Sequence, residues 1–224
     1  MRSPHCLLGQ MPEPASLRWL PHIRERGLIK GEVLQAQGFV AHEFQVIKLG
    51  FVLALRRGDD GVARPIALFG NGHAMGSPGW LQLPSAMYFQ ALGPGRICCV
   101  DIAGATRQGL VDAGFVQALA ISHAHGNALL AEWARIVRIP GVLGQLAATL
   151  LQLSRLQSSL LVRLPGQGAL AALLATTRET IARSLHRLAR LGALERRDRW
   201  HCTLCPEALR QISGGQAPDR SAQD

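Results

Sequence analysis

Glycines interrupt the chain at short intervals between residues 27 and 95, and they leave only short apolar segments such as residues 44–49 and 51–55. Short strands separated by turns are typical of an antiparallel barrel or sandwich. The sequence Gly58-Asp-Asp-Gly61 predicts a hairpin turn, because Asp and Gly tolerate the positive φ that such turns require. We therefore expect this part of the chain to be built from β-strands.

The pattern becomes helical after about residue 105. Apolar and small residues follow one another at alternating spacings of four and three, which predicts a long helix with one continuous face. We expect this face to be the interface of a parallel homodimer, and its residues are Phe115, Leu119, Ser122, Gly126, Leu129, Trp133 and Ile136. Pro140 should end the helix, because proline cannot continue a helix interior. Residues 142–153 predict a second apolar helix.

The net charge of +9 is concentrated toward the C-terminus, where residues 150–213 hold 10 arginines against 4 acidic residues. Arginine forms forked hydrogen bonds to phosphates and guanine edges that lysine cannot copy. The charge favours nucleic acid as a partner, although a solvated basic surface would explain it equally well. Because the sequence shows neither an export signal nor an apolar run of membrane-spanning length, we expect a cytoplasmic protein with no membrane partner.

Residues 167–191 carry the pattern of two short helices joined by a tight turn. Ile181, Leu185 and Leu188 form the apolar face of the second helix, whose opposite face is basic. Thr176 or Thr177 can cap this helix, and Thr176-x-x-Glu179 has the spacing of a capping box. A short helix, a tight turn and a basic second helix predict a helix-turn-helix that enters the major groove of DNA.

The following residues 192–205 read as two short strands around an Arg/Asp turn, which predicts a wing beside the phosphate backbone. In this stretch, Thr177-Arg-Glu-Thr-Ile-Ala-Arg183 and the residues after it resemble the recognition helix and wing of the CRP/FNR family of bacterial transcription regulators. Gly31-Glu-Val-Leu-Gln-Ala-Gln-Gly38 and Leu68-Phe-Gly-Asn-Gly-His-Ala-Met-Gly76 are similar to strands and turns of the family's β-roll sensor domain. The resemblance extends weakly over most of the chain.

The resemblance implies an α+β fold with a jelly-roll-like β-roll of the cyclic-nucleotide-binding kind, a long dimerisation helix and a C-terminal winged helix-turn-helix. The implied divisions are a leader and short helix with Leu17, Leu20 and Ile23 at helical spacing (1–26), the sensor (27–105), the helical segment (106–139), the DNA-binding domain (140–213) and a disordered tail (214–224). The implied function is regulation of transcription by a homodimer that binds double-stranded DNA at a pseudo-palindrome with half-sites like TGTGA. RNA polymerase is the implied protein partner, and no enzymatic activity is implied.

By the same resemblance, Arg178, Glu179 and Arg183 fall on base-contacting positions. Arginine can donate two hydrogen bonds to guanine, and Glu can accept one from cytosine, so these residue types suit the role. The Glu179 carboxylate could instead accept hydrogen bonds at the helix N-terminus as part of the cap. The residues expected to contact phosphates are Thr177, Thr180, Arg187, Arg190, Arg197 and Arg199.

The sensor region departs from the family members that bind cyclic nucleotides. Ser77 stands where those members have a Glu for the ribose hydroxyl, and Pro84 stands where they have an Arg for the phosphate. An unpaired phosphate charge is costly to desolvate, so we expect an effector other than cyclic AMP. The residues expected to line an effector pocket are Gly76, Ser77, Ser85 and Cys98.

The five cysteines and the histidines leave other forms of control open. Only Cys6 stands near the N-terminus, so an iron–sulfur cluster of four thiolates is not expected within one chain. The main alternative is a redox or haem-based gas-sensing regulator of the same fold, in which His73 could ligate haem. Cys98 and Cys99 should point to opposite faces of a strand. A cytoplasmic metal or redox protein that uses Cys202 and Cys205 is the alternative from another class, and a constitutive DNA binder is a third. The sequence itself requires no metal or cofactor.

Overall fold

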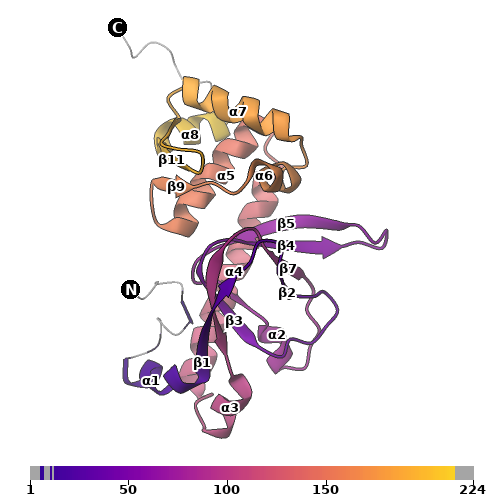
Figure 1. Ribbon diagram of the computed structural model, residues 1–224, viewed down its shortest axis with the longest axis vertical. Coiled ribbons are helices and arrows are strands. Elements are labelled where there is room, and N and C mark those ends of the chain that lie inside the picture. The colour runs from indigo at the N-terminus through magenta and orange to yellow at the C-terminus, as the bar shows by residue number, and fades with distance from the viewer. Residues whose placement is uncertain (1–5, 8–10, 12, 215–224) are drawn as a thin grey trace. The chain divides into compact units, whose positions relative to one another are not determined.

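The computed structural model describes residues 6, 7, 11 and 13–214 of the chain (Figure 1). The chain divides into two compact units, Met1–Ala131 (unit 1) and Glu132–Asp224 (unit 2), and the boundary falls inside one long helix, α4 (Ala113–Ile136). No helix in the described part of the chain combines the length and the apolar character that crossing a membrane would require.

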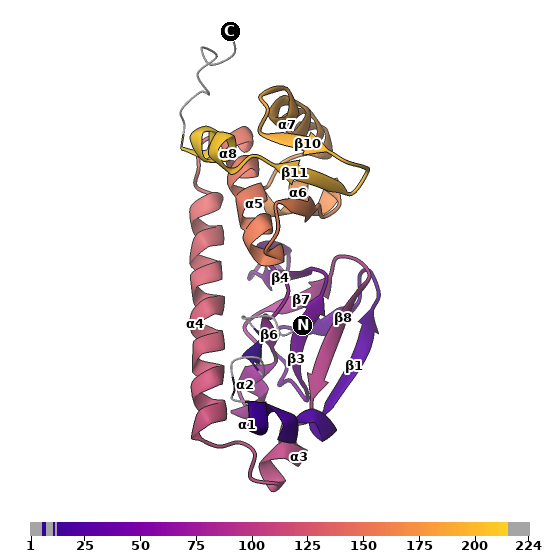
Figure 2. The same ribbon diagram turned by 90° about the vertical axis from the view of Figure 1, so that its left-hand side faces the viewer.

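Unit 1 contains most of the strands, as the glycine-rich sequence predicts. Its elements before α4 are α1 (Glu13–Arg18), η2 (Leu20–His22), β1 (Ile23–Leu28), β2 (Val33–Gln35), β3 (Phe44–Leu49), β4 (Val52–Arg57), β5 (Ala63–Phe69), β6 (Ala74–Met75), α2 (Ser77–Trp80), β7 (Tyr88–Ala91), β8 (Gly95–Val100) and α3 (Ile102–Arg107). The strands form two antiparallel four-stranded sheets, in the orders β1-β8-β3-β6 and β2-β7-β4-β5 (Figure 2). This confirms the expected jelly-roll-like β-roll.

The hairpin turn predicted at residues 58–61 joins β4 to β5, and the two strands project as an arm in Figure 1. Gly61 adopts a φ of 73°, which a residue without a side chain adopts at little steric cost. The Asp60 carboxylate accepts a hydrogen bond from the Val62 amide at 3.0 Å and another from the Arg64 guanidinium, also at 3.0 Å. The turn is therefore closed by its own side chain as well as by glycine.

The N-terminal segment differs from the expected short helix. The helix ends at Arg18, a 3-10 turn with Pro21 follows, and Ile23 already pairs with Val100 in the β1–β8 ladder. The β-roll thus begins at Ile23 rather than at residue 27. Leu17 and Leu20 are exposed, so their helical spacing does not mark a buried face. Strand pairing at Ile23 overrides the local helical pattern.

The long helix is present, but its heptad-like face is turned toward its own chain. Phe115 and Trp133 are both 0 % exposed within a single chain, and Leu129 and Ile136 are buried as well. Phe115 stacks on Trp19 with ring centroids 4.5 Å apart and belongs to the same hydrophobic cluster. Five of the seven residues expected at the dimer interface are thus buried within a single chain, whereas Leu119 and Gly126 remain half-buried. An amphipathic helix buries its apolar face against whatever apolar surface its own fold provides, and the dimer interface itself stays a prediction.

Unit 2 contains the end of α4 and seven further elements. They are α5 (Val142–Gln157), β9 (Leu161–Arg163), α6 (Gln167–Leu173), α7 (Arg178–Arg190), β10 (Leu194–Arg196), β11 (His201–Leu204) and α8 (Pro206–Ser213). The strands form one antiparallel sheet in the order β10-β11-β9, and α5 packs on both α7 and α8. Strand β9 and helix α8 were not predicted from the sequence, although Pro206 at the start of α8 and the spacing of Leu209 and Ile212 were signals for a helix.

Candidate nucleic-acid interface

Helices α6 and α7 form the predicted helix-turn-helix. Thr177 is the N-cap of α7, and its hydroxyl oxygen accepts a hydrogen bond from the Thr180 amide at 3.2 Å. Of the two caps that the sequence allowed, the structure uses Thr177 rather than Thr176. The cap satisfies one of the unpaired amides at the start of α7 and so fixes where the helix begins.

The turn between the two helices passes through Ala175, which adopts a φ of 50°. This left-handed conformation costs an L-residue free energy that glycine would not lose, because the Cβ atom approaches the carbonyl oxygen. The Thr176 amide donates to the Ala171 carbonyl at 2.9 Å, which closes the turn. The sequence did not mark Ala175 as special, because alanine is normally a helix former.

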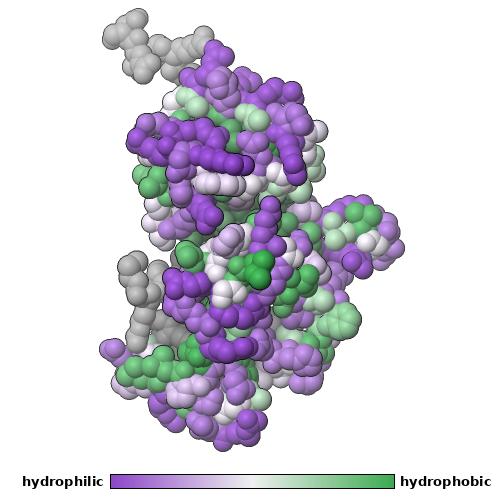
Figure 3. Space-filling view, viewed as in Figure 1, coloured by the Kyte–Doolittle hydropathy of each residue, from purple (hydrophilic) through white to green (hydrophobic). Residues whose placement is uncertain are grey.

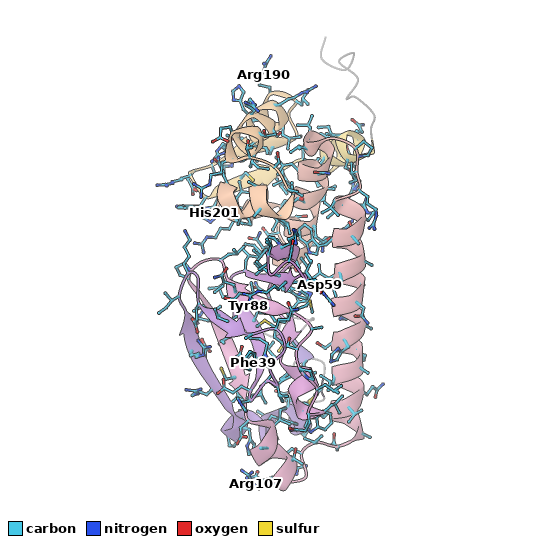
Figure 4. All side chains as sticks on the ribbon, turned by 90° about the vertical axis from the view of Figure 1, so that its right-hand side faces the viewer. Phe39, Asp59, Tyr88, Arg107, Arg190 and His201 are labelled. Atoms are coloured by element: carbon cyan, nitrogen blue, oxygen red, sulfur yellow. The ribbon has the colours of Figure 1, made fainter. Side chains whose placement is uncertain are left out.

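Helix α7 is sharply divided into a buried and an exposed face. Its buried residues are Ile181, Ser184, Leu185 and Leu188. The side chains expected to read bases, Arg178, Glu179 and Arg183, are all exposed, as are Arg187 and Arg190 farther along. Figure 3 shows a largely hydrophilic surface over α7, and in Figure 4 the Arg190 side chain projects away from the helix. The helix therefore presents its charged face to solvent.

The three expected base readers are oriented by neighbours at the start of α7. The guanidinium of Arg178 lies against Gly168 of α6, where an added Cβ would stand 2.9 Å from Arg178 Nε. Arg183 donates to the Thr180 hydroxyl at 3.0 Å. Hydrogen bonds to the Glu179 carboxylate from its own backbone amide and from Thr177 hold the pKa of Glu179 below its ordinary value. Glu179 thus remains a charged acceptor at the helix N-terminus and also engages the cap.

The predicted wing is the hairpin of β10 and β11 (Figure 2). Arg197 donates from Nε to the Thr203 hydroxyl at 2.9 Å and pairs with Glu195 at 2.9 Å. Arg199 lies over the ring of Trp200, with 4.9 Å between its Cζ atom and the ring centroid. Both arginines expected to contact phosphates are therefore held in defined positions on the wing.

Residues 144–212 match the family described as the Crp-like helix-turn-helix domain. The chain carries a Crp-like helix-turn-helix. No curated protein shows significant sequence similarity to the chain.

Solved structures show that the fold is that of CRP/FNR-type transcription regulators. FixK2 of Bradyrhizobium japonicum is 18% identical, with a TM-score of 0.71 over 85% of this chain and 96% of its own. A CRP-family regulator of Thermus thermophilus is 17% identical, with a TM-score of 0.65 over 88% of this chain and 100% of its own. CLP of Xanthomonas campestris, a c-di-GMP responsive regulator, is 18% identical, with a TM-score of 0.64 over 86% of this chain and 99% of its own.

Three of the four residues expected to line the effector pocket, Gly76, Ser85 and Cys98, have side-chain surroundings that the structure describes. Gly76 lies so close to the Glu43 carbonyl that an added Cβ would overlap it. The Ser85 hydroxyl donates to the Met87 carbonyl at 2.7 Å and accepts from the Met87 amide at 3.3 Å. Cys98 packs against the cluster that contains Phe115. The side chain of Ser77 lies outside the described part of the structure. The described members thus belong to different environments.

Cys99 points to the other face of its strand, as strand alternation predicts. It is almost completely buried, and burial raises the pKa of its thiol. The neighbouring Glu43 carboxylate raises this pKa further, whereas a hydrogen bond from Arg26 opposes the shift. Arg26 also pairs with Glu32 at 2.5 Å. A polar network therefore occupies part of this face of the β-roll.

The structure does not support joint use of Cys202 and Cys205. Cys202 is 0 % exposed, and burial raises the pKa of its thiol to about 11, whereas Cys205 is exposed at the start of α8. Among the described residues, no three His, Cys, Asp or Glu side chains cluster in a way that could hold a metal ion. His73, the possible haem ligand, contacts the Gly70 carbonyl through Nδ1 at 3.1 Å and packs edge-on against Phe69.

Proposed function

We propose that this chain is a sequence-specific DNA-binding transcription regulator that acts as a homodimer on a pseudo-palindromic site. The observation that carries the proposal is the division of α7 into a buried apolar face and an exposed face with Arg178, Glu179 and Arg183 near its N-terminal end. The N-terminal end of a recognition helix is the part that meets base edges in the major groove. RNA polymerase is the proposed protein partner, because the fold is that of CRP/FNR-type transcription regulators.

The two groups of arginines have different tasks in this proposal. Arg178 and Arg183 each make a forked contact with a guanine, and Glu179 accepts from a cytosine. Arg187, Arg190, Arg197 and Arg199, together with Thr177 and Thr180, contact phosphates, which position the protein but carry no sequence information.

The test is a binding titration on a duplex with two TGTGA half-sites and on a scrambled duplex of equal length. Arg183→Ala should cost about 1–3 kcal/mol per half-site and relax the preference at one base pair. The matched control is Arg190→Ala on the same helix, which should weaken both duplexes alike and lower the salt slope by about one for each phosphate that Arg190 neutralises. Equal weakening of both duplexes by Arg183→Ala would show that Arg183 binds a phosphate instead of a base.

Helix α4 offers a second face for the homodimer in place of the buried one. On the side opposite Phe115 and Trp133, exposed residues recur at spacings of four, four, three and four, and most of them are small: Val116, Ala120, Ala124, Asn127 and Ala131. Small side chains allow two helices to approach closely, and this spacing suits a coiled-coil contact. We propose that two copies of the chain meet along this alanine face.

A charge placed on the alanine face tests the dimer. Ala124→Glu puts two like charges in direct opposition across a symmetric interface, and it should convert the protein to a monomer in sedimentation at micromolar concentration. Because Ala124 is exposed, the far-UV circular dichroism should not change. A wild-type protein that is monomeric both alone and on DNA would refute the dimer.

We further propose that the effector is not cyclic AMP. Ser77 and Pro84 stand in place of the carboxylate and guanidinium of cyclic-nucleotide binders, and the Ser85 hydroxyl is already bonded to Met87. Isothermal calorimetry should therefore show no tight binding of cyclic AMP or cyclic GMP. Binding with a micromolar or tighter Kd would refute this proposal.

A further inference from the structure

The tip of the wing carries a large aromatic side chain that has no place in the core of unit 2. Trp200 is 44 % exposed, whereas Trp133 in the same unit is fully buried. Exposure of an indole is unfavourable unless the side chain meets a partner, because burial of aromatic surface is among the largest stabilising contributions available. The exposed ring therefore calls for a physical explanation.

The backbone around Trp200 is held rigidly. The Asp198 carboxylate accepts hydrogen bonds from the amides of Trp200 at 2.6 Å and His201 at 2.8 Å, and it also contacts the His201 ring at 2.8 Å. The Trp200 carbonyl accepts from the Leu164 amide at 2.7 Å, which ties the tip to the segment after β9. A side chain on so constrained a turn loses little conformational entropy when it binds a partner.

The surroundings of the indole are strongly basic. Arg199 lies over the ring at 4.9 Å, and Arg196 donates to the Arg199 carbonyl at 3.2 Å. Arg163 faces His201 across the sheet, in register on β9. An aromatic ring flanked by guanidinium groups suits a polyanion that also offers flat or apolar surfaces, which describes the deoxyribose and phosphate rims of DNA.

We propose that Trp200 packs on the deoxyribose rim of the minor groove next to each half-site, while Arg199 binds the adjoining phosphate. This inference rests on the proposed DNA-binding function and adds an apolar contact to it. The wing thus contributes more than charge, because indole contact with sugar depends on shape and is insensitive to salt. Because every sequence presents deoxyribose, the contact strengthens specific and non-specific binding alike.

Acrylamide quenching of tryptophan fluorescence tests the contact directly. The chain has four tryptophans, of which Trp19 and Trp133 are buried and Trp80 is half-buried. The measurement is therefore made in a Trp80→Phe background, in which the accessible emission comes from Trp200. Either duplex at saturation should protect this emission from acrylamide, and Trp200→Phe should abolish the DNA-dependent protection.

Binding constants measured at several salt concentrations complete the test. Trp200→Ala should weaken binding to both duplexes by about tenfold, the effect expected when one aromatic side chain no longer packs on a nucleic acid. It should leave the salt slope unchanged, whereas Arg199→Ala should lower the slope by about one for each phosphate that Arg199 neutralises. The matched control is Leu160→Ala, which removes an equally exposed apolar side chain at the opposite end of the same sheet and should have no effect.

The outcomes separate this inference from the proposed function. If saturating DNA leaves acrylamide quenching unchanged and Trp200→Ala binds as tightly as the wild type, the wing-tip contact is refuted even though the protein binds DNA. If the wild-type protein binds neither duplex, both the proposed DNA-binding function and the wing-tip contact are refuted.

Discussion

The start of α7 in unit 2 and the segment around α2 in unit 1 use their polar groups in opposite ways. On α7, Arg178 and Arg183 remain exposed, and their few bonds to neighbours leave most guanidinium donors facing solvent. In unit 1, the Ser85 hydroxyl is bonded to Met87, and Gly76 is pressed against the Glu43 carbonyl. The polar groups of the first region therefore remain accessible to a partner, whereas those of the second region are bonded or packed within the fold.

This difference predicts how the two regions respond to substitution. Changes at the exposed positions of α7 should alter DNA binding with little effect on stability, because surface substitutions usually change the free energy of unfolding only slightly. Changes in unit 1 at positions packed against its own chain should lower the stability of that unit first.

The largest effect is expected from Phe115→Ala. Because Phe115 is fully buried and stacks on Trp19, its removal leaves a cavity and should cost about 3–5 kcal/mol of unfolding free energy. Chemical denaturation followed by tryptophan fluorescence would measure this loss. The control, Gln117→Ala on the exposed side of α4, should stay within about 0.5 kcal/mol of the wild type. An unchanged stability in a variant that no longer dimerises would restore the heptad-like face as the interface.

The next largest effect is expected from Gly76→Ala. The new Cβ would overlap the Glu43 carbonyl, and the φ of 83° is unfavourable for alanine, so we expect a loss of about 3 kcal/mol. The control is Gly93→Ala, which adds a Cβ in open space. Thermal unfolding of both variants would measure the difference. Equal stability of the two variants would show that this segment of the β-roll is loose enough to admit a ligand.

A gain in stability is expected in unit 2 from Ala175→Gly. Glycine adopts the left-handed turn without the steric cost that alanine incurs, so the unfolding free energy should rise by about 0.5–1 kcal/mol. Ala172→Gly, three residues earlier in α6, is the matched control and should lower the free energy by a similar amount, because that residue is helical. Calorimetric unfolding would distinguish the expected gain of unfolding free energy in Ala175→Gly from the expected loss in Ala172→Gly. A loss of stability in Ala175→Gly would mean that the turn is not left-handed in solution.

The smallest effect concerns the exposed hairpin arm of unit 1. The Arg64 guanidinium, together with the Val62 amide, lowers the pKa of Asp60 to about 2. A carboxylate with a lowered pKa stabilises the fold above its unfolded pKa of about 4, and this stabilisation is lost as the pH falls toward 2. The contribution is small because the pair is exposed to solvent. NMR titration should place the Asp60 midpoint near 2, and Arg64→Gln should raise it; a midpoint unaffected by Arg64→Gln would contradict the pairing.

The amino-acid sequence by itself determined the features that depend on neighbouring residues. The Gly58–Gly61 turn, a threonine cap at residue 176 or 177 and the two faces of α7 follow from backbone preferences and from a helical period of 3.6 residues. These local rules hold whatever the rest of the chain does. For the same reason, the resemblance at residues 177–183 was enough to predict the helix-turn-helix.

Only the tertiary structure decided which apolar faces are buried, and against what. The spacing from Phe115 to Ile136 is the same for a dimer interface as for a helix packed on its own domain, and only the structure shows that Phe115 stacks on Trp19 of its own chain. Likewise, Ile23 became a strand residue because Val100 was available to pair with it, and Ala175 adopted a left-handed conformation at the turn between α6 and α7. Such choices depend on contacts between residues far apart in the chain, which no local pattern encodes.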